Sequence, residues 1–266
     1  MVFESPDDAL YQAAETARRA LPLVDLTSLN DGDDEASAVE LCRRAVTPAG
    51  PVAAVCLWPE FVPVAKRELK GSGVRIATVV NFPGGSLPLD RVLGQIAGAL
   101  VDGADEIDVV MPYTSLLTGK PHGIAEYLSE VRQACGTHTL KVILETGTLA
   151  KPALIERAAQ IAVATGADFL KTSTGKVSVG ATPGAAQILL ETAKAAKAKG
   201  RRVGVKVSGG VRDIAGAATY LALSDRICGP GFAVPETFRF GASGLLDALL
   251  AELGHGRAGS ARQQTY

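Results

Sequence analysis

The chain has 266 residues, of which 47% are hydrophobic, and its 27 basic and 28 acidic residues give a formal net charge of −1. This balance gives no reason to expect nucleic acid or an anionic membrane as a partner. The length suits one sizeable core and is typical of a single α/β barrel domain.

Cysteine usage and the N-terminus indicate the compartment. Cys42, Cys56, Cys135 and Cys228 are scattered without a Cys-x-x-Cys pair, and the chain has three histidines. Neither a disulfide framework nor a metal site is therefore expected, and no cofactor is expected either. The N-terminus is acidic where a signal peptide would be basic, and no apolar run approaches the ~18 residues of a membrane span. A cytoplasmic protein is expected.

Short β-branched runs alternate with longer, alanine-rich amphipathic segments along the whole chain. A helix is expected before the first strand, since Ser5 suits its N-cap, Pro6 its first turn, and Arg18 and Arg19 its last turn. Eight strands are expected after it, over residues 23–26, 52–57, 74–80, 106–111, 140–145, 169–172, 202–207 and 238–241. Helical patterns follow them, for example over 152–165, 183–199 and 244–253.

Eight repeats of strand and helix predict an α/β fold, a (β/α)8 TIM barrel with an extra N-terminal helix. The alternative, an open doubly wound sheet, is weakened because no Gly-x-Gly-x-x-Gly turn follows the first strand. We expect one barrel domain over residues 1–254. Residues 255–266 are polar and are expected to form a flexible C-terminal tail.

Two lysines interrupt apolar strands where the strands run into glycine- and hydroxyl-rich loops. Lys171 lies near the end of the sixth predicted strand, and Lys206 lies in the seventh, where Val205 and Val207 flank it. Because side chains alternate between the faces of a strand, Lys206 points into the barrel when the valines pack against helices. The same parity places Lys171 inside. Repulsion between two ammonium groups and partial desolvation would each lower a lysine pKa, and a neutral amine is the form that attacks a carbonyl.

A carboxylate is expected to join the two lysines. On the fourth strand Ile107 and Val109 share one face, which leaves Asp108 on the other face with Glu106. Asp108 suits either a proton carrier or a structural ion pair of the barrel, and the sequence leaves both readings open. These parts support metal-free Schiff-base chemistry, in which Lys171 forms an iminium that accepts electrons from a breaking carbon–carbon bond. Lys206 would modulate Lys171.

Three loops at the end of the barrel are suited to a phosphate. Residues 172–176 offer the hydroxyl of Thr172, the flexible backbone of Gly175 and the cation of Lys176; residues 208–212 offer consecutive amides; residues 240–244 open the last helix. Backbone amides at a helix N-terminus form an anion site, and TIM barrels commonly bind phosphate after the last strands.

These segments resemble the DeoC family of deoxyribose-phosphate aldolases over nearly the whole chain. The most specific motifs are Lys171-Thr-Ser-Thr-Gly-Lys176 and Lys206-Val-Ser-Gly-Gly-Val-Arg212, and further matches surround Asp108 and Ser243. The resemblance implies reversible cleavage of 2-deoxy-D-ribose 5-phosphate to acetaldehyde and D-glyceraldehyde 3-phosphate, as part of deoxyribose phosphate catabolism. The enzyme would be a class I, metal-independent aldehyde-lyase acting on small molecules.

The resemblance also implies roles for individual residues. Lys171 matches the Schiff-base lysine, Lys206 the second lysine, and Asp108 the acidic proton relay. Positions around the substrate phosphate are matched by Gly175, Lys176, Gly209, Gly210 and Ser243, and the substrate-facing wall by Asp25, Thr27 and Cys56. Taken by itself, Cys56 is better explained as a small hydrophobic residue of the core, because nothing nearby in the sequence indicates a nucleophile. Close relatives carry a second serine where this chain has Gly244, whose amide still suits the phosphate.

Other readings remain open. Another Schiff-base barrel aldolase, such as a transaldolase or a longer-chain phosphosugar aldolase, would use the same lysine chemistry with a different donor. A non-catalytic sugar-phosphate-binding barrel would have no use for two facing lysines. Lys141 and Glu145 are interpreted as polar-layer residues of the barrel. The sequence does not fix the oligomeric state, and a homodimer is one that it allows. Tyr266 is either the end of a disordered tail or a mobile lid over the site.

Overall fold

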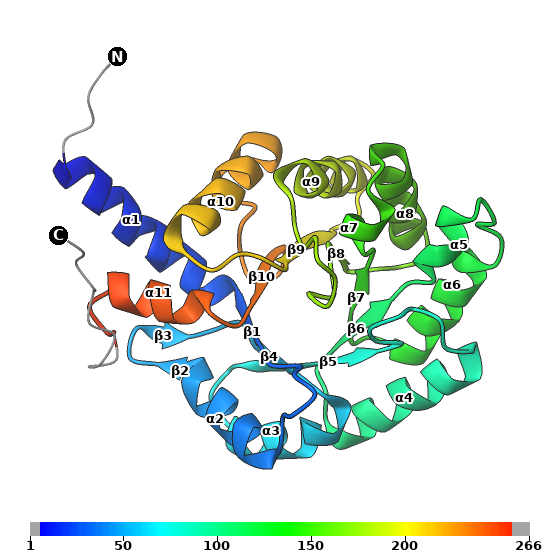
Figure 1. The fold of residues 1–266 in the computed structure, drawn as a ribbon, viewed down its shortest axis with the longest axis horizontal. Coiled ribbons are helices and arrows are strands. Elements are labelled where there is room, and N and C mark those ends of the chain that lie inside the picture. The colour runs from blue at the N-terminus through cyan, green and yellow to red at the C-terminus, as the bar shows by residue number, and fades with distance from the viewer. Residues whose placement is uncertain (1–5, 257–266) are drawn as a thin grey trace.

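Eight parallel strands form a closed barrel in a computed structural model of the chain, which describes residues 6–256. Around the ring the strands follow the order β1, β10, β9, β8, β7, β6, β5, β4, so β1 pairs with both β10 and β4. Helices surround this ring (Figure 1). The predicted (β/α)8 TIM barrel is confirmed.

Each predicted strand matches a barrel strand to within two residues at either end. The barrel strands are β1 (Val24–Thr27), β4 (Ala54–Leu57), β5 (Arg75–Val80), β6 (Glu106–Val110), β7 (Thr139–Ile143), β8 (Phe169–Lys171), β9 (Gly204–Ser208) and β10 (Phe238–Ala242). A short antiparallel hairpin of β2 (Val46–Thr47) and β3 (Gly50–Pro51) was not predicted, because strands of two residues carry no periodic signal.

The helices cover the outside of the barrel. They are α1 (Pro6–Ala20), α2 (Glu35–Ala45), α3 (Val62–Glu68), α4 (Leu89–Asp102), α5 (Tyr113–Leu117), α6 (Ile124–Cys135), α7 (Thr146–Leu149), α8 (Pro152–Ala164), α9 (Pro183–Ala198), α10 (Ile214–Cys228) and α11 (Leu245–Glu252). The predicted N-terminal helix is α1, which lies beside α10 and α11 (Figure 1). No helix within residues 6–256 has both the length and the apolar composition needed to cross a membrane.

Two sequence predictions fall outside the described residues. Ser5, the predicted cap of α1, precedes them, and Tyr266, the predicted lid, follows them. The division between a barrel over residues 1–254 and a tail over residues 255–266 therefore stays a prediction, as does the role of Tyr266.

Local capping fixes where several helices begin. Asp34 accepts a hydrogen bond from the amide of Ser37, whose side chain bonds back, and this capping box starts α2. Thr182 caps α9 ahead of Pro183, and the side chain of Asp213 accepts from the amide of Gly216 at the start of α10. The last two caps hold the helices that follow the two lysine strands.

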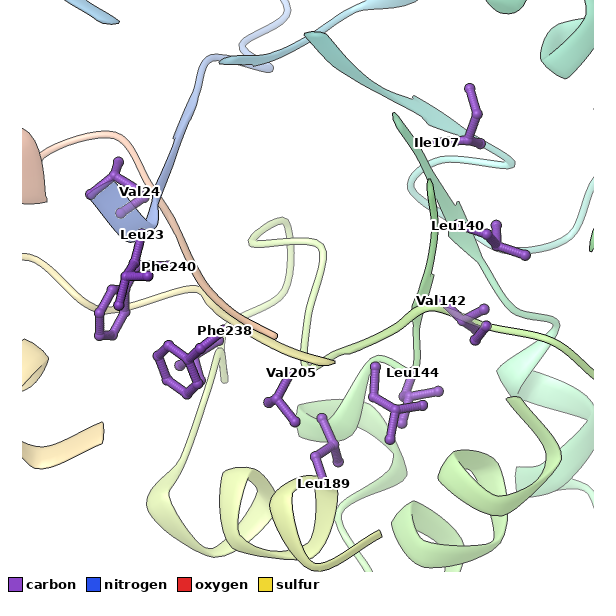
Figure 2. Packing of buried hydrophobic residues seen from close by; sticks show 14 of the residues in the cluster. Leu23, Val24, Ile107, Leu140, Val142, Leu144, Leu189, Val205, Phe238 and Phe240 are labelled. Atoms are coloured by element: carbon purple, nitrogen blue, oxygen red, sulfur yellow. The ribbon is translucent and has the colours of Figure 1, made fainter. Parts of the chain in front are cut away.

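The hydrophobic core lies between the strands and the helices. On β9, Val205 points toward Leu189 of α9, and on β10 Phe238 and Phe240 point outward from the ring (Figure 2). All four side chains are completely buried. Burial of apolar surface at about 25 cal/mol per Å² makes this layer the main stabilising contribution to the barrel.

The residues that alternate with these apolar positions along the strands point into the barrel. Leu140 and Val142 pack outward on β7, so Lys141 lies inside, and Arg239 lies inside between Phe238 and Phe240. Strand register then stacks the inward residues, since Asp108 pairs with Lys141 and Lys171 pairs with Lys206. The alternation that buries apolar groups outside the ring thus gathers charged groups within it.

Candidate active site

Lys171 is the last residue of β8 and lies at the floor of a cavity that opens at the carboxyl ends of the strands. Its side chain is 3% exposed, so the amine is nearly removed from bulk water yet lines the cavity. Its Nζ lies 2.8 Å from Oδ2 of Asp108. The predicted inward position of Lys171 is confirmed.

Asp108 of β6 binds three lysines. Its Oδ2 is 2.8 Å from Nζ of both Lys171 and Lys206, and its Oδ1 is 2.7 Å from Nζ of Lys141. Asp108 is completely buried, and although burial opposes ionisation, the surrounding ammonium groups hold the pKa of its carboxyl well below the usual value. The predicted convergence of Asp108, Lys171 and Lys206 is confirmed, while Lys141 is a third partner that the sequence analysis placed only in a polar layer.

Two further carboxylates, Asp25 and Glu106, connect Lys141 and Lys206 to Arg239. Asp25 of β1 is 2.6 Å from Nζ of Lys206 through Oδ2 and 2.6 Å from Nη1 of Arg239 through Oδ1. Glu106 is 2.5 Å from Nζ of Lys141 and 3.0 Å from Nη2 of Arg239. The barrel interior therefore holds a continuous network rather than one isolated ion pair.

The two central lysines respond oppositely to this environment. Burial lowers the pKa of Lys171, and although Asp108 opposes this, Lys206 adds to it and the pKa remains below its usual value. Burial alone would also lower the pKa of Lys206, but the carboxylates of Asp108 and Asp25 outweigh it and raise the pKa well above its usual value. The predicted lowering of the lysine pKa is confirmed for Lys171. It is wrong for Lys206, because Asp25 supplies a second carboxylate that stabilises its charged form.

The cavity above Lys171 has a volume of about 280 Å³ and is lined mainly by loops. Its lining residues are Thr27, Ser28, Leu29, Asn30, Lys171, Thr174, Gly175, Lys176, Ser208, Gly209, Gly210, Val211, Arg212, Gly241, Ala242 and Ser243. An amine at the base, and amides, hydroxyls and two cations at the rim, suit a small molecule with a carbonyl at one end and an anion at the other.

The loops after β8 and β9 lie against each other at the rim. Gly180 has no room for a Cβ atom because the backbone of Gly209 lies directly beside it. Gly209 has a φ of 87°, and the amide of Ala181 bonds to the carbonyls of Ser208 and Gly209. The side chain of Thr172 bridges the same loops through both the carbonyl and the amide of Ser208. The two loops are therefore fixed relative to each other.

Lys176 is held over the rim. Its Nζ lies 5.9 Å from the centre of the Trp58 ring and 3.6 Å from Oδ1 of Asp31. The amide of Lys176 donates to the hydroxyl of Thr174, which itself donates to Glu145 at 2.6 Å. These contacts hold a cation among the residues that line the cavity.

Residues 19–232 match the family described as DeoC/LacD family aldolase. The chain belongs to this family.

Relatives agree with this assignment. A protein of Agrobacterium fabrum named deoxyribose-phosphate aldolase is 46% identical over 254 residues, which cover 95% of this chain and 97% of that protein. An apo-form crystal structure from Toxoplasma gondii ME49, provisionally named deoxyribose-phosphate aldolase, matches with a TM-score of 0.84 and 30% identity over 92% of this chain and 98% of that one. The tetrameric deoxyribose phosphate aldolase of Aeropyrum pernix matches with a TM-score of 0.72 and 26% identity over 93% and 98%. The protein is an aldolase, a carbon–carbon lyase that acts on small molecules.

The structure of the aldolase places the other predicted site residues in two groups. Thr27, Gly175, Lys176, Gly209, Gly210 and Ser243 line the cavity. Asp25, Thr172 and Cys56 are completely buried behind it. Cys56 packs in a small apolar cluster with Leu29, and burial raises the pKa of its thiol. Gly244 follows the lining residue Ser243 and is the N-cap of α11.

Several residues of the site escaped the sequence analysis. No role was predicted for Arg239. Its neighbours Phe238 and Phe240 are apolar, and strand alternation could have predicted from them that Arg239 points into the barrel. Trp58 and Asp31 are brought to Lys176 by tertiary structure, and no local pattern predicts this contact. Within residues 6–256, no three His, Cys, Asp or Glu residues cluster as metal ligands would.

Gly241 leaves room for Lys206, and we expect Gly241→Ala to lower turnover. A Cβ atom there would lie 2.9 Å from Cε of Lys206 and 2.7 Å from Cβ of Ser208, which is closer than such atoms approach. Lys206 must then shift, and displacement of a reacting group by about 1 Å can cost on the order of 100-fold. Steady-state kinetics would measure the loss, with Gly98→Ala as the control because its Cβ meets open space. Parental turnover in Gly241→Ala would contradict this prediction.

Proposed function

We propose that the aldolase reversibly cleaves 2-deoxy-D-ribose 5-phosphate to acetaldehyde and D-glyceraldehyde 3-phosphate through a Schiff base on Lys171. The observation that carries this proposal is the position of Lys171. It is a nearly buried lysine of lowered pKa at the base of the cavity, within 2.8 Å of a carboxylate that it shares with Lys206. The name of the Agrobacterium fabrum relative supports the substrate.

The first half of the reaction forms the iminium. The neutral amine of Lys171 attacks C1 of the open-chain sugar, and the resulting carbinolamine loses its hydroxyl as water. Lys206 is charged and shares Oδ2 of Asp108 with Lys171, so it can donate the proton that the departing hydroxyl needs. Asp108 accepts hydrogen bonds from both amines and passes protons between them.

The second half breaks the carbon–carbon bond. Lys206, neutral after protonating the departing hydroxyl, accepts the proton of the C3 hydroxyl; the C2–C3 electron pair moves into the iminium, and glyceraldehyde 3-phosphate leaves, so that Lys206 again holds a proton for C2 of the enamine. The remaining enamine takes up a proton at C2, and water then releases acetaldehyde and regenerates Lys171. Because the iminium cation accepts the electrons, this class I route is metal-independent.

The phosphate is proposed to bind at the rim, across the cavity from Lys171. Gly175 and Lys176 contribute from the loop after β8, Gly209 and Gly210 from the loop after β9, and Ser243 with the amide of Gly244 from the start of α11. Backbone amides and a cation suit an anion, and its binding would orient the sugar for attack. Asp25, Thr27 and Cys56 support the substrate wall in this proposal.

Reductive trapping tests the function. Incubation with acetaldehyde and borohydride, followed by peptide mapping, should place one two-carbon adduct on Lys171, and deoxyribose 5-phosphate should be cleaved at the same rate with and without EDTA. Recovery that required zinc would assign a metal-dependent mechanism. Faster use of dihydroxyacetone or its phosphate than acetaldehyde as the donor would assign a transaldolase or another phosphosugar aldolase. Binding without turnover or adduct would indicate a sugar-phosphate-binding barrel.

Gly244→Ser is expected to increase the preference for phosphorylated substrate. A Cβ at residue 244 meets open space, so the added hydroxyl fits without displacing a neighbour. A hydrogen bond to a charged group contributes about 1.5–3 kcal/mol, which corresponds to roughly tenfold or more. The measurement is the ratio of kcat/KM for deoxyribose 5-phosphate to that for deoxyribose. An unchanged ratio would show that residue 244 does not contact the phosphate.

Compartment and assembly stay predictions. A cytoplasmic location follows from the sequence, which also allows a homodimer. The Aeropyrum pernix relative is a tetramer, so light scattering of the purified protein should distinguish these states.

A further inference from the structure

The barrel interior contains more charged groups than the proposed reaction uses. Seven ionisable side chains form one connected set, which we call the interior ion network. Its members are Asp25, Glu106, Asp108, Lys141, Lys171, Lys206 and Arg239. Each is at most 5% exposed. Together they extend from the cavity floor at Lys171 to the cavity at the other end of the barrel, which Glu106 and Arg239 line.

The network has one more basic group than acidic groups. It contains four basic side chains and three carboxylates, so it is electrically balanced when one basic group is neutral. An uncompensated charge in such a buried place is expensive, and a buried group commonly loses its charge instead. Balance therefore requires that one of the four basic groups gives up its proton.

Contacts identify Lys171 as that group. Lys206 binds two carboxylates at 2.6 and 2.8 Å, Lys141 binds three at 2.5, 2.7 and 3.6 Å, and Arg239 binds two at 2.6 and 3.0 Å. Among the described residues, Lys171 is within ion-pair distance of Asp108 alone, through an oxygen that Lys206 also binds. Its charged form is the least stabilised of the four.

We propose that Lys141 and Glu106 are positioning residues that set the protonation state of Lys171 through Asp108. Lys141 occupies Oδ1 of Asp108 and thereby compensates the charge that would otherwise hold a proton on Lys171. Glu106 binds Lys141 and Arg239 and so determines how much of that compensation is available. This inference rests on the proposed role of Lys171 as the Schiff-base lysine.

The other groups around Lys171 are consistent with this assignment. Asp108 reaches it from β6 and Lys206 from β9, while Cys56 of β4 is held as a thiol because burial raises its pKa. Glu145, after β7, accepts hydrogen bonds from Thr174 and has no ion pair among residues 6–256. Burial raises the pKa of Glu145 although Thr174 and Lys171 oppose this, and no ion pair among the described residues joins it to the network.

The pH profile of kcat/KM reports ionisations of the free enzyme. Its acid limb, the fall in kcat/KM at low pH, reflects protonation of Lys171, so charge changes in the network should move this limb. Lys141→Met removes a cation, so the network becomes negative unless Lys171 keeps its proton, and the limb should move to higher pH. Glu106→Gln removes a carboxylate, so the limb should move to lower pH. A nearby charge shifts a pKa by about one unit or more, which sets the expected size of both shifts. The double variant restores the balance and should return the limb close to the parental position.

The experiment measures kcat/KM against pH for the parent, both single variants and the double variant, together with borohydride trapping of acetaldehyde. Arg132→Met is the control, because it removes an ion pair of 2.8 Å to Asp168 outside the network and should leave the limb in place. Coincident limbs in all folded variants, or shifts of the two single variants in the same direction, would overturn the proposal.

Folding outcomes are also informative. If both single variants unfold, recovery of folding in the double variant supports the proposal and failure of all three contradicts it. Trapping separates this inference from the proposed function: a parent without an adduct on Lys171 refutes the function, whereas an adduct with unmoved limbs refutes only the role of Lys141 and Glu106.

Discussion

Lys171→Ala is expected to lose aldolase activity by about 10⁴-fold or more, the scale expected for removal of a covalent nucleophile. The fold should survive, because Asp108 keeps Lys206 at 2.8 Å and Lys141 at 2.7 Å. The variant also removes the one basic group whose charge the interior ion network does not need for balance. The measurements are turnover and the midpoint of thermal unfolding. We expect turnover to be lost and the unfolding midpoint to stay near the parental value.

A second lysine of the same cavity provides the control for this experiment. Lys176→Ala removes a cation from the rim and should weaken binding of the phosphorylated substrate, while borohydride still traps acetaldehyde on Lys171. Full activity in Lys171→Ala, or an adduct on Lys206 in the parent enzyme, would overturn the assignment of Lys171.

Lys206→Leu is expected to fold and to lose at least about 100-fold in kcat, the low end for a general acid or base. In this variant Asp25 keeps its ion pair with Arg239, and Asp108 keeps its contacts with Lys141 and Lys171. Each carboxylate therefore still has a basic partner. Breaking a buried ion pair still costs about 3–5 kcal/mol in the free energy of unfolding. Because a cation next to Asp108 is gone, Lys171 holds its proton more strongly and the acid limb of kcat/KM should move to higher pH.

The measurements are kcat, the pH profile and chemical denaturation. Lys194→Leu, on the exposed side of α9, is the control for replacement of a lysine by leucine. Parental kcat and an unmoved pH profile in Lys206→Leu would show that Lys206 is a structural residue of the barrel.

Strand alternation explains why so much of the site could be predicted. Valines at 205 and 207 and apolar residues at 107 and 109 have to face the helices, so Lys206 and Asp108 have to face inward. Eight strands of this kind, each followed by a helix, predict a closed barrel, and the inward side chains of a barrel lie close together. The fold and the convergence of Asp108, Lys171 and Lys206 therefore follow from local patterns.

What the sequence could not supply is which inward groups touch. Lys141 was interpreted as a member of a polar layer, yet it lies 2.7 Å from Asp108, because the register of β6 and β7 places the two side by side. The pKa of Lys206 moves upward because Asp108 and also Asp25, from the first strand of the barrel and 2.6 Å away, both bind it. Both facts depend on strand register and barrel closure, which no short segment of sequence encodes.

The contact between Gly180 and Gly209 limits how this aldolase can be redesigned. Since neither backbone can retreat without displacing the other, the loops after β8 and β9 have to be exchanged together when a different substrate is sought. In a library that randomises one loop alone, most variants would lose the packing between the two loops. Grafting residues 172–182 and 208–213 as a single cassette keeps the rim intact and leaves the chemistry at Lys171 undisturbed.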